Sequence, residues 1–256
     1  MKIGLFIKKE VINESLEKEI INKIVSSGNV FDNEKPELVI SLGGDGTFLK
    51  AVHKYALTDD GVIFAPINKG KLGFFSDFVI DDVDEIINSF SKFDIKHFHL
   101  LKADIGNETI YAVNEIRIEN PFHTLISEVF INNTELETFR GNGLVVSSSI
   151  GSSAYNKSLG GAVIDTDLEV LQLSEIAPIN NSLYRSLKSS LVVSKDSMIT
   201  FKGEFKDIVI GYDHLVKSDL HSNEISFSVS NKNLNLLVKR GHNHIARLSE
   251  AFIKGK

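Results

Sequence analysis

The sequence contains no cysteine among its 256 residues. This absence excludes a disulfide framework, a zinc site with thiolate ligands, an iron–sulfur cluster and a cysteine nucleophile. An excess of positive charge is also absent, because the chain has 28 lysines and arginines but 34 aspartates and glutamates, which gives a net charge of −6. General nucleic-acid binding depends on clustered positive charge, so we expect no nucleic-acid partner.

Long hydrophobic runs are missing as well. No apolar stretch approaches the roughly 20 residues that a membrane-spanning helix needs. The first apolar run reaches Lys8 and Lys9 too early for a signal peptide. The hydrophobic fraction of 42% is ordinary for a globular core. We therefore expect a cytoplasmic protein with no membrane partner, folded as one large domain or two small ones.

Strands and helices alternate over the first hundred residues. Apolar runs predict three strands, and apolar residues at helical spacing predict three helices. In chain order these segments are 1–7, 16–25, 38–42, 48–56, 62–67 and 83–90. Such repetition predicts a Rossmann-like parallel sheet with crossover helices, in an α/β domain of residues 1–97. A last helical pattern within 240–256 predicts a C-terminal helix that returns to this domain.

The pattern changes after residue 97, where helical periodicity nearly disappears. Alternating apolar and polar residues, as in 225–230, predict a β-rich, sandwich-like domain of residues 98–239 with mainly antiparallel strands. The tripeptide Asn132-Asn133-Thr134 lies between two such runs and predicts a hairpin turn. We expect one helical exception in this domain, at 167–176.

The most informative motif is Gly-Gly-Asp-Gly-Thr at residues 43–47, which follows an apolar strand and opens a helix. Ligands of open α/β sheets bind where the strands end at their carboxyl edge. Glycines, together with the positive end of a helix, favour a phosphate at that edge. The motif has neither the spacing of a dinucleotide-binding fingerprint nor the lysine of a P-loop.

Asp45 is unusual in a phosphate-binding loop, because its charge repels phosphate. Two roles resolve this conflict: a general base toward a hydroxyl, or a ligand for a divalent cation that bridges the phosphates. Both roles indicate phosphoryl transfer, which relies mainly on positioning and charge stabilisation. The structural alternative is a tight turn in which Asp45 only caps the helix.

Two shorter segments hold further candidate groups. The loop at 68–75 contains Lys69, Lys71 and Phe74, which fit phosphates and a nucleotide base, unless this is a solvated loop with buried phenylalanines. The dipeptide Asn114–Glu115 fits the edge of adenine and the ribose hydroxyls. Its alternative is an ordinary dipeptide in a strand, because such pairs are commonplace.

A third segment, residues 147–161, is rich in serine and glycine and fits a loop that wraps around a ligand. The alternative is a flexible linker, although linkers seldom contain residues such as Tyr155. No Gly-x-Ser-x-Gly elbow is present, so a hydrolase serine is not expected. The eight histidines form no metal-binding set, and we expect surface positions for most of them, with His214 as a candidate exception.

Taken together, the motifs at 43–47, 114–115 and 151–161 resemble the NAD kinase family in order and spacing, and the chain is similar to its short bacterial members along its whole length. The first motif alone is shared with diacylglycerol-type lipid kinases and phosphofructokinases. The resemblance implies transfer of the terminal phosphate of ATP to the 2′-hydroxyl of the adenosine ribose of NAD, giving NADP. It also implies a divalent cation, Mg²⁺, and a homo-oligomer, since homodimers and tetramers are usual in the family, and we expect a tetramer here. Some bacterial members of the family also use polyphosphate.

The resemblance also implies roles for individual residues. Asp45 is the expected catalytic residue, as base or metal-positioning carboxylate, and no dedicated set of protein metal ligands is identified. The residues implied in NAD binding are Asp45, Gly46, Phe74, Asn114, Glu115, Arg140, Asn142, Ser153, Ala154, Tyr155, Ser158 and Asp213. The residues implied in the phosphate loop are Gly43, Gly44, Gly46 and Thr47.

Three positions depart from the family pattern. The family usually has aspartate where this chain has Asn142, and Ser149 and Ile150 replace a proline and a hydroxyl residue. These departures concern the details of the NAD pocket and leave Asp45 unaffected.

Two other functions remain open on the sequence. A diacylglycerol-type lipid kinase explains Asp45 but not the run from Ser153 to Gly161, and a net charge of −6 suits an anionic bilayer poorly. A non-catalytic nucleotide-binding or scaffold protein explains the glycines, but it gives Asp45 no reason to lie among phosphates.

Overall fold

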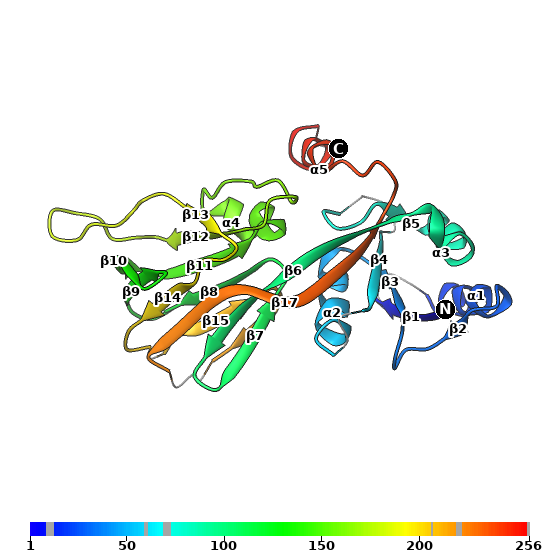
Figure 1. Cartoon of the computed structure of the whole chain (residues 1–256), viewed down its shortest axis with the longest axis horizontal. Coiled ribbons are helices and arrows are strands. Elements are labelled where there is room, and N and C mark those ends of the chain that lie inside the picture. The colour runs from blue at the N-terminus through cyan, green and yellow to red at the C-terminus, as the bar shows by residue number, and fades with distance from the viewer. Residues whose placement is uncertain (9–12, 59–60, 69–72, 206, 219–221, 255–256) are drawn as a thin grey trace. The chain divides into compact units, whose positions relative to one another are not determined.

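The computed structural model describes residues 1–8, 13–58, 61–68, 73–205, 207–218 and 222–254 (Figure 1). The chain divides into two compact units: Met1–His99 together with Lys232–Lys256 form unit 1, and Leu100–Asn231 form unit 2. Within the described ranges, no helix has the length and apolar character that a membrane crossing requires.

The sheet of unit 1 consists of parallel strands. They are β1 (Lys2–Ile7), β2 (Val30–Phe31), β3 (Leu38–Leu42), β4 (Ile63–Asn68), β5 (Phe78–Val79) and the last part of β17 (Glu224–Val238). The strand order is β17-β4-β3-β1-β2, with β5 beside β4. β3 is buried along its whole length between β1 and β4. Burial on both faces explains why its sequence is nearly uninterrupted by polar residues.

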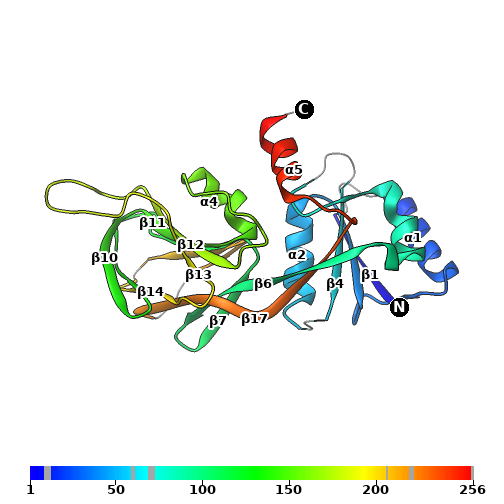
Figure 2. The ribbon, with the colours of Figure 1, turned by 45° about the horizontal axis from the view of Figure 1, so that its top comes forward.

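Helices cover both faces of this sheet (Figure 2). They are α1 (Glu14–Ser26), α2 (Asp45–Tyr55) and α3 (Val83–Asn88), with short helical turns at Ile80–Asp82 and Phe90–Lys92. Near the C-terminus lie α5 (His244–Leu248) and a helical turn at Ser249–Ile253, neither of which has a buried residue. α1 and α3 bury Ile24 and Ile86 in one core cluster with the strands. On the other face, the ring of Phe48 in α2 lies 6.1 Å from that of Phe64 in β4. The predicted α/β alternation and the helix near the C-terminus are confirmed.

Unit 2 contains two mainly antiparallel sheets. The first is formed by the last part of β6 (Asp94–Ile105), by β7 (Glu108–Ala112), β9 (Leu125–Ile131), β10 (Thr134–Gly141) and β14 (Ile199–Lys202), and by the first part of β17. The second has the order β13-β12-β11-β8-β15-β16, made of β8 (Glu115–Glu119), β11 (Gly143–Ser148), β12 (Val170–Ile176), β13 (Leu191–Ser194), β15 (Val209–Tyr212) and β16 (Leu215–Lys217). A short helix, α4 (Tyr155–Ser158), follows β11.

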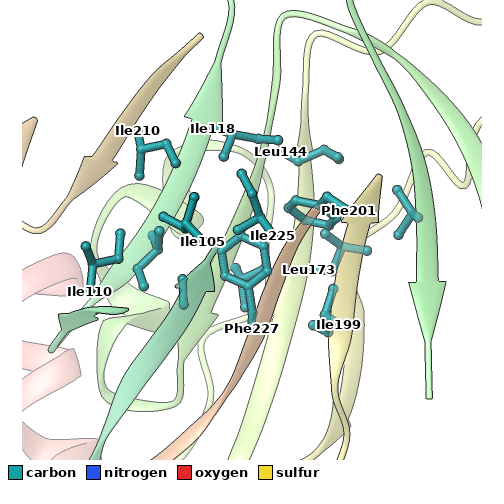
Figure 3. Close-up of a cluster of buried hydrophobic side chains, with 14 of the residues drawn as sticks. Ile105, Ile110, Ile118, Leu144, Leu173, Ile199, Phe201, Ile210, Ile225 and Phe227 are labelled. Atoms are coloured by element: carbon teal, nitrogen blue, oxygen red, sulfur yellow. The ribbon is translucent and has the colours of Figure 1, made fainter. Parts of the chain in front are cut away.

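The core of unit 2 lies where side chains of the two sheets meet (Figure 3). Phe201 and Phe227 come from neighbouring strands of the first sheet, and their ring centroids are 4.7 Å apart. Ile118 and Leu144 come from the second sheet, and all four side chains are buried. This packing of alternate residues from two sheets confirms the predicted sandwich-like architecture.

The helix expected at 167–176 is wrong, because residues 170–176 form strand β12. β12 pairs with β11 on one side and with β13 on the other. Leu171 and Leu173 point into the core cluster, while Gln172 and Ser174 are buried by polar contacts. Pairing on both sides therefore decided the conformation of a segment whose local pattern is ambiguous.

The hairpin turn expected at 132–134 is confirmed. Asn132 and Asn133 connect β9 to β10 and have φ angles of +50° and +66°. A tight hairpin turn of this kind needs a positive φ at both central positions, and asparagine adopts it at a lower cost than most residues.

Candidate functional site

The Gly-Gly-Asp-Gly-Thr loop connects β3 to α2 in unit 1. Gly43 has a φ of +155°, and a Cβ atom there would lie 2.3 Å from Thr47 Oγ1, so only glycine fits. Gly44 is the N-cap of α2 and Gly46 lies in its first turn. A Cβ atom on either of these glycines would meet no described atom within 4 Å, and both residues are exposed. The backbone at the start of α2 is therefore open to an anion.

Asp45 is the first residue of α2, and Gly44, not Asp45, is its N-cap. The structural alternative in which Asp45 caps the helix is therefore wrong. Its half-buried carboxylate accepts hydrogen bonds from the backbone N–H groups of Phe74 at 3.0 Å and Phe75 at 3.4 Å. A Cβ atom on Gly73 would lie 2.2 Å from Asp45 Oδ1, so the backbone of this loop approaches the carboxylate closely.

The other candidates of the loop at 68–75 differ in their placement. Phe74 is half-buried, and its ring centroid lies 5.0 Å from that of Phe252, near the C-terminus. Lys69 and Lys71 lie outside the described residues. The aromatic pair in unit 1 shows that Phe74 has a packing partner of its own, which the sequence pattern did not reveal.

Asn114 and Glu115 lie at the start of β8 in unit 2, with exposed fractions of 9% and 4%. Among the residues that the structure describes, no group hydrogen-bonds to Asn114 Oδ1 or Glu115 Oε2. A buried polar atom without a partner is costly, and it calls for a ligand or a water molecule. These two oxygen atoms are therefore candidate acceptors for a bound molecule.

The pKa of Glu115 is raised to about 7. Burial is the largest cause, followed by the negative charge of Asp213. The positive charge of Arg117 and the backbone N–H of Tyr155 act in the opposite direction. At neutral pH this carboxyl is therefore divided between its neutral and charged forms, so a ligand can select either one.

Asp213 occupies the turn between β15 and β16, with a φ of +50°. Its two carboxylate oxygens accept hydrogen bonds from the backbone N–H groups of Val113 at 2.8 Å and Asn114 at 2.7 Å. Asp213 thus fixes the backbone just before Glu115. His214 is its exposed neighbour in the same turn.

The serine- and glycine-rich segment lies against Asn114. A Cβ atom on Gly151 would be only 2.0 Å from the carbonyl oxygen of Asn114. The hydroxyl of Ser148 donates to the carbonyl of Val113 at 2.6 Å. Only a residue without a side chain permits this approach, which explains the glycine in the motif.

The same segment is held from its other side by Asn156, which is completely buried. Asn156 Nδ2 donates to the carbonyl of Ser152 at 3.3 Å, and Asn156 Oδ1 accepts from the hydroxyl of Ser174 at 2.6 Å. Ser153 is buried, whereas Ala154 is half-buried. The flexible-linker alternative is therefore wrong, because this segment is fixed by buried hydrogen bonds.

Tyr155, the first residue of α4, is half-buried, and the guanidinium carbon of Arg117 lies 5.6 Å from its ring centroid. Arg117 also forms an ion pair with Glu119 at 2.8 Å. Arg117 was not among the residues predicted from the sequence. Its position two residues after Glu115 in a strand places both side chains on one face, and this spacing was the signal that could have found it.

Arg140, Asn142 and Ser158 are not joined to this group by any contact described above. Arg140 lies on β10, in the other sheet of unit 2, with its guanidinium carbon 4.5 Å from the centroid of the Tyr184 ring. Asn142 is exposed between β10 and β11, and its backbone N–H donates to the carbonyl of Ile176 at 3.0 Å. Ser158 is exposed at the end of α4.

Metal-binding side chains do not cluster in the described parts of the chain, where no group of three histidine, aspartate or glutamate side chains could hold an ion. Asp45 is nevertheless a suitable single ligand, because Mg²⁺ is usually held by one or two carboxylates together with substrate phosphates. The open backbone at Gly44 and Gly46 leaves space for those phosphates beside it.

Comparisons with known proteins give a consistent result. The model of the ATP-NAD kinase N-terminal domain matches residues 5–95, and that of the C-terminal domain matches residues 112–238. An NAD kinase of Leuconostoc citreum is 32% identical over an alignment of 260 positions, which covers 99% of this chain and 98% of the relative. An NAD kinase of Lactobacillus acidophilus is 36% identical over 244 residues, covering 92% and 90%.

Two solved structures share the fold. A yeast NADH kinase complexed with NADH matches with a TM-score of 0.82 at 19% identity, covering 100% of this chain and 89% of the yeast chain. An NAD kinase from Archaeoglobus fulgidus in complex with ATP matches with a TM-score of 0.77 at 19% identity, covering 97% of each chain. Both family models match this chain, and NAD kinases are similar to it over nearly its whole length. This chain therefore belongs to the NAD kinase family.

Proposed function

We propose that this chain is an NAD kinase that transfers the terminal phosphate of ATP to the 2′-hydroxyl of the adenosine ribose of NAD and so produces NADP. One observation carries the proposal: the carboxylate of Asp45 is held by two backbone N–H groups at the open start of α2. A carboxylate among phosphate-binding glycines is best explained by a proton to accept or a cation to hold.

In the proposed reaction, the N–H groups at the start of α2 bind phosphate oxygens of the nucleotide. Asp45 accepts the proton of the 2′-hydroxyl as its oxygen bonds to the terminal phosphorus of ATP. The bond from that phosphorus to the bridging oxygen breaks, and ADP leaves with the electron pair. The proton remains on Asp45 until solvent removes it.

A divalent cation, with Mg²⁺ as the proposed ion, supplies positive charge for the phosphates when it is bound. In the alternative role of Asp45, its carboxylate holds this cation instead of accepting the proton. ATP is the proposed phosphate donor, and polyphosphate is a second candidate donor.

The polar acceptors of unit 2 are proposed to bind NAD. Asn114 and Glu115 offer buried oxygen atoms to the adenine and ribose of the dinucleotide, and Tyr155 offers an aromatic face. The remaining proposed contacts with NAD are Asp45, Gly46, Phe74, Arg140, Asn142, Ser153, Ala154, Ser158 and Asp213. Asp213 is proposed to fix the backbone of Asn114, because its oxygens accept the N–H groups of Val113 and Asn114.

A coupled assay tests the proposed function. The purified chain is mixed with ATP, Mg²⁺ and NAD, and NADP is detected with an NADP-dependent dehydrogenase. We expect NADP to form. Phosphorylation of diacylglycerol in a parallel assay without NADP formation would show a lipid kinase, and nucleotide binding without turnover would show a non-catalytic protein.

Replacement of Tyr155 by alanine is expected to weaken NAD binding more than ATP binding. Stacking of a nucleotide base on an aromatic side chain contributes about 1–3 kcal/mol, so the KM for NAD should rise by about 5- to 150-fold. Steady-state kinetics with each substrate varied in turn measure the effect. Tyr155→Phe, which keeps the ring, is the matched control and should remain near the parent value. An unchanged KM for NAD in Tyr155→Ala would remove this residue from the pocket.

We also propose a homotetramer in the cytoplasm. Unit 2 exposes large apolar side chains, including Phe122 at 75%, Leu183 at 82% and Val216 at 63%, and exposed apolar surface of this kind often marks an interface. Light scattering should give a mass of about four times the 28.4 kDa of one chain. A fully active monomer would contradict this proposal.

A further inference from the structure

A buried arginine near the C-terminus contacts the loop that holds Asp45. Arg247 Nη1 donates to the carbonyl oxygens of Gly73, at 2.6 Å, and of Ser76. Its Nη2 forms an ion pair with Asp77. Only 10% of the Arg247 side chain and 8% of the Asp77 side chain are exposed. The planar guanidinium suits this set of three acceptors, because it presents several donors in a fixed geometry.

The C-terminal segment is tied to the same loop at further points. The buried carboxylate of Asp77 also accepts the backbone N–H of Lys239 at 3.0 Å and Nδ1–H of His242 at 2.8 Å. Three donors from residues 239–247 therefore converge on one carboxylate, which fixes the segment that carries Arg247.

One peptide group connects Arg247 to Asp45. The carbonyl of Gly73, which accepts from Arg247, and the N–H of Phe74, which donates to Asp45, belong to the same planar peptide unit. A rotation of this peptide would break both hydrogen bonds at once. Its two hydrogen bonds also polarise each other in the same direction.

Electrostatics agree with this arrangement. Burial lowers the pKa of Arg247, whereas the carboxylates of Asp45 and Glu250 act in the opposite direction. The contact between Arg247 and Asp45 runs through the peptide between Gly73 and Phe74.

We propose that Arg247 is a positioning residue for phosphoryl transfer, which sets the direction of the Asp45 carboxylate by holding the peptide between Gly73 and Phe74. This inference rests on the proposed function of Asp45. It concerns residues of unit 1 alone, and it assigns to the C-terminal segment a part in the chemistry as well as in packing.

Kinetics of four variants test the proposal. Arg247→Gln should lower kcat by about 10- to 10²-fold, because small misplacements of a reacting group have effects of this size. The KM for NAD should change by less than about threefold. Arg247→Lys should not restore kcat, because an ammonium group cannot replace the planar set of donors. Arg240→Gln removes the same charge from the same segment, at an exposed side chain that contacts only Ser91 and Asp94 among the described groups, and should leave kcat unchanged.

The fourth variant separates positioning from a general loss of structure. If Arg247 acts through Asp45, Arg247→Gln should have less than about a twofold effect in an Asp45→Asn background, where the carboxylate is already gone. An equal loss of kcat in both backgrounds, or a normal kcat in the single variant, would overturn the proposal.

A crystal structure of Arg247→Gln provides a readout that does not depend on activity. We expect the peptide between Gly73 and Phe74 to turn away from Asp45, whereas an unmoved peptide would refute the inference whatever the enzyme does. If this variant does not fold, the same measurement on Arg247→Lys replaces it. Failure of the parent chain to make NADP would contradict the proposed function instead, and the crystal structure would still test the positioning.

Discussion

Replacement of Asp45 by asparagine is expected to lower the turnover number by about 10²–10⁴-fold, which is the usual effect of losing a general base. Affinity for NAD should hold or rise, because the substitution removes a negative charge beside the phosphates. Turnover from the coupled assay and NAD affinity from equilibrium titration measure the two effects separately.

The structure shows what this substitution keeps. Asparagine Oδ1 can still accept the N–H of Phe74, which is the shorter of the two bonds to Asp45, whereas the longer bond from Phe75 is lost because Nδ2 is a donor. Gly44 caps α2 with no help from the Asp45 side chain, so the helix does not depend on the carboxylate. Asp84→Asn is the matched control, because Asp84 is an exposed acidic residue in the first turn of α3 that pairs with Lys23. Near-normal turnover in Asp45→Asn would falsify the catalytic role.

The second large effect concerns stability and pH. Glu115 has a pKa of about 7, raised from an ordinary 4.5 by burial and by the charge of Asp213. Between these two values the folded chain retains a proton that the unfolded chain releases. The contribution of Glu115 to the free energy of unfolding is therefore highest below pH 4.5, falls as the pH rises, and is lower by about 3 kcal/mol above pH 7.

Glu115→Gln should abolish this pH dependence. The variant should match the parent near pH 4.5 and exceed it at pH 8 by up to about 3 kcal/mol. Urea unfolding monitored at several pH values gives the comparison. Glu128→Gln, at an exposed position of β9, is the control and should show no such trend. A constant difference between Glu115→Gln and the parent across this range would show that Glu115 does not titrate there.

Glu115 is a buried carboxyl that destabilises the folded chain above neutral pH, so its presence is better explained by function than by stability. Replacement by glutamine is expected to stabilise the protein, so stability alone does not explain the glutamate. Its oxygen atom without a partner is instead consistent with the proposed binding of NAD at this residue. The stability experiment therefore also bears on the proposed NAD site.

Much of unit 1 could be predicted because its patterns are local. The apolar run of β3 and the helical spacing in α1 and α2 each lie within a few consecutive residues. β12 could not be predicted in the same way, because its conformation depends on strands that pair with it on both sides. The local spacing of apolar residues does not indicate which distant strands will pair with a segment.

The candidate site could also be predicted from the sequence only in part. The motifs at 43–47 and 114–115 predicted the groups that we propose for catalysis and for NAD binding. The residues that surround these groups could be identified only in the folded structure. The partners of the Asp45 carboxylate are backbone N–H groups, which any residue except proline provides. Arg247 and Gly73 are 174 positions apart and share no sequence signal.

That separation has a consequence during synthesis. Ribosomes add about 5–20 residues per second, so roughly 9–35 seconds pass between the synthesis of Gly73 and that of Arg247. Strand β17, which pairs with β4 at Asn235 and Ile63, also arrives late. A nascent chain can form the first strands and α2 early, yet its Asp45 loop lacks its arginine until residue 247 has been made. Premature termination before residue 247 would leave a chain that has the glycine motif but lacks the arginine proposed to position the Asp45 carboxylate.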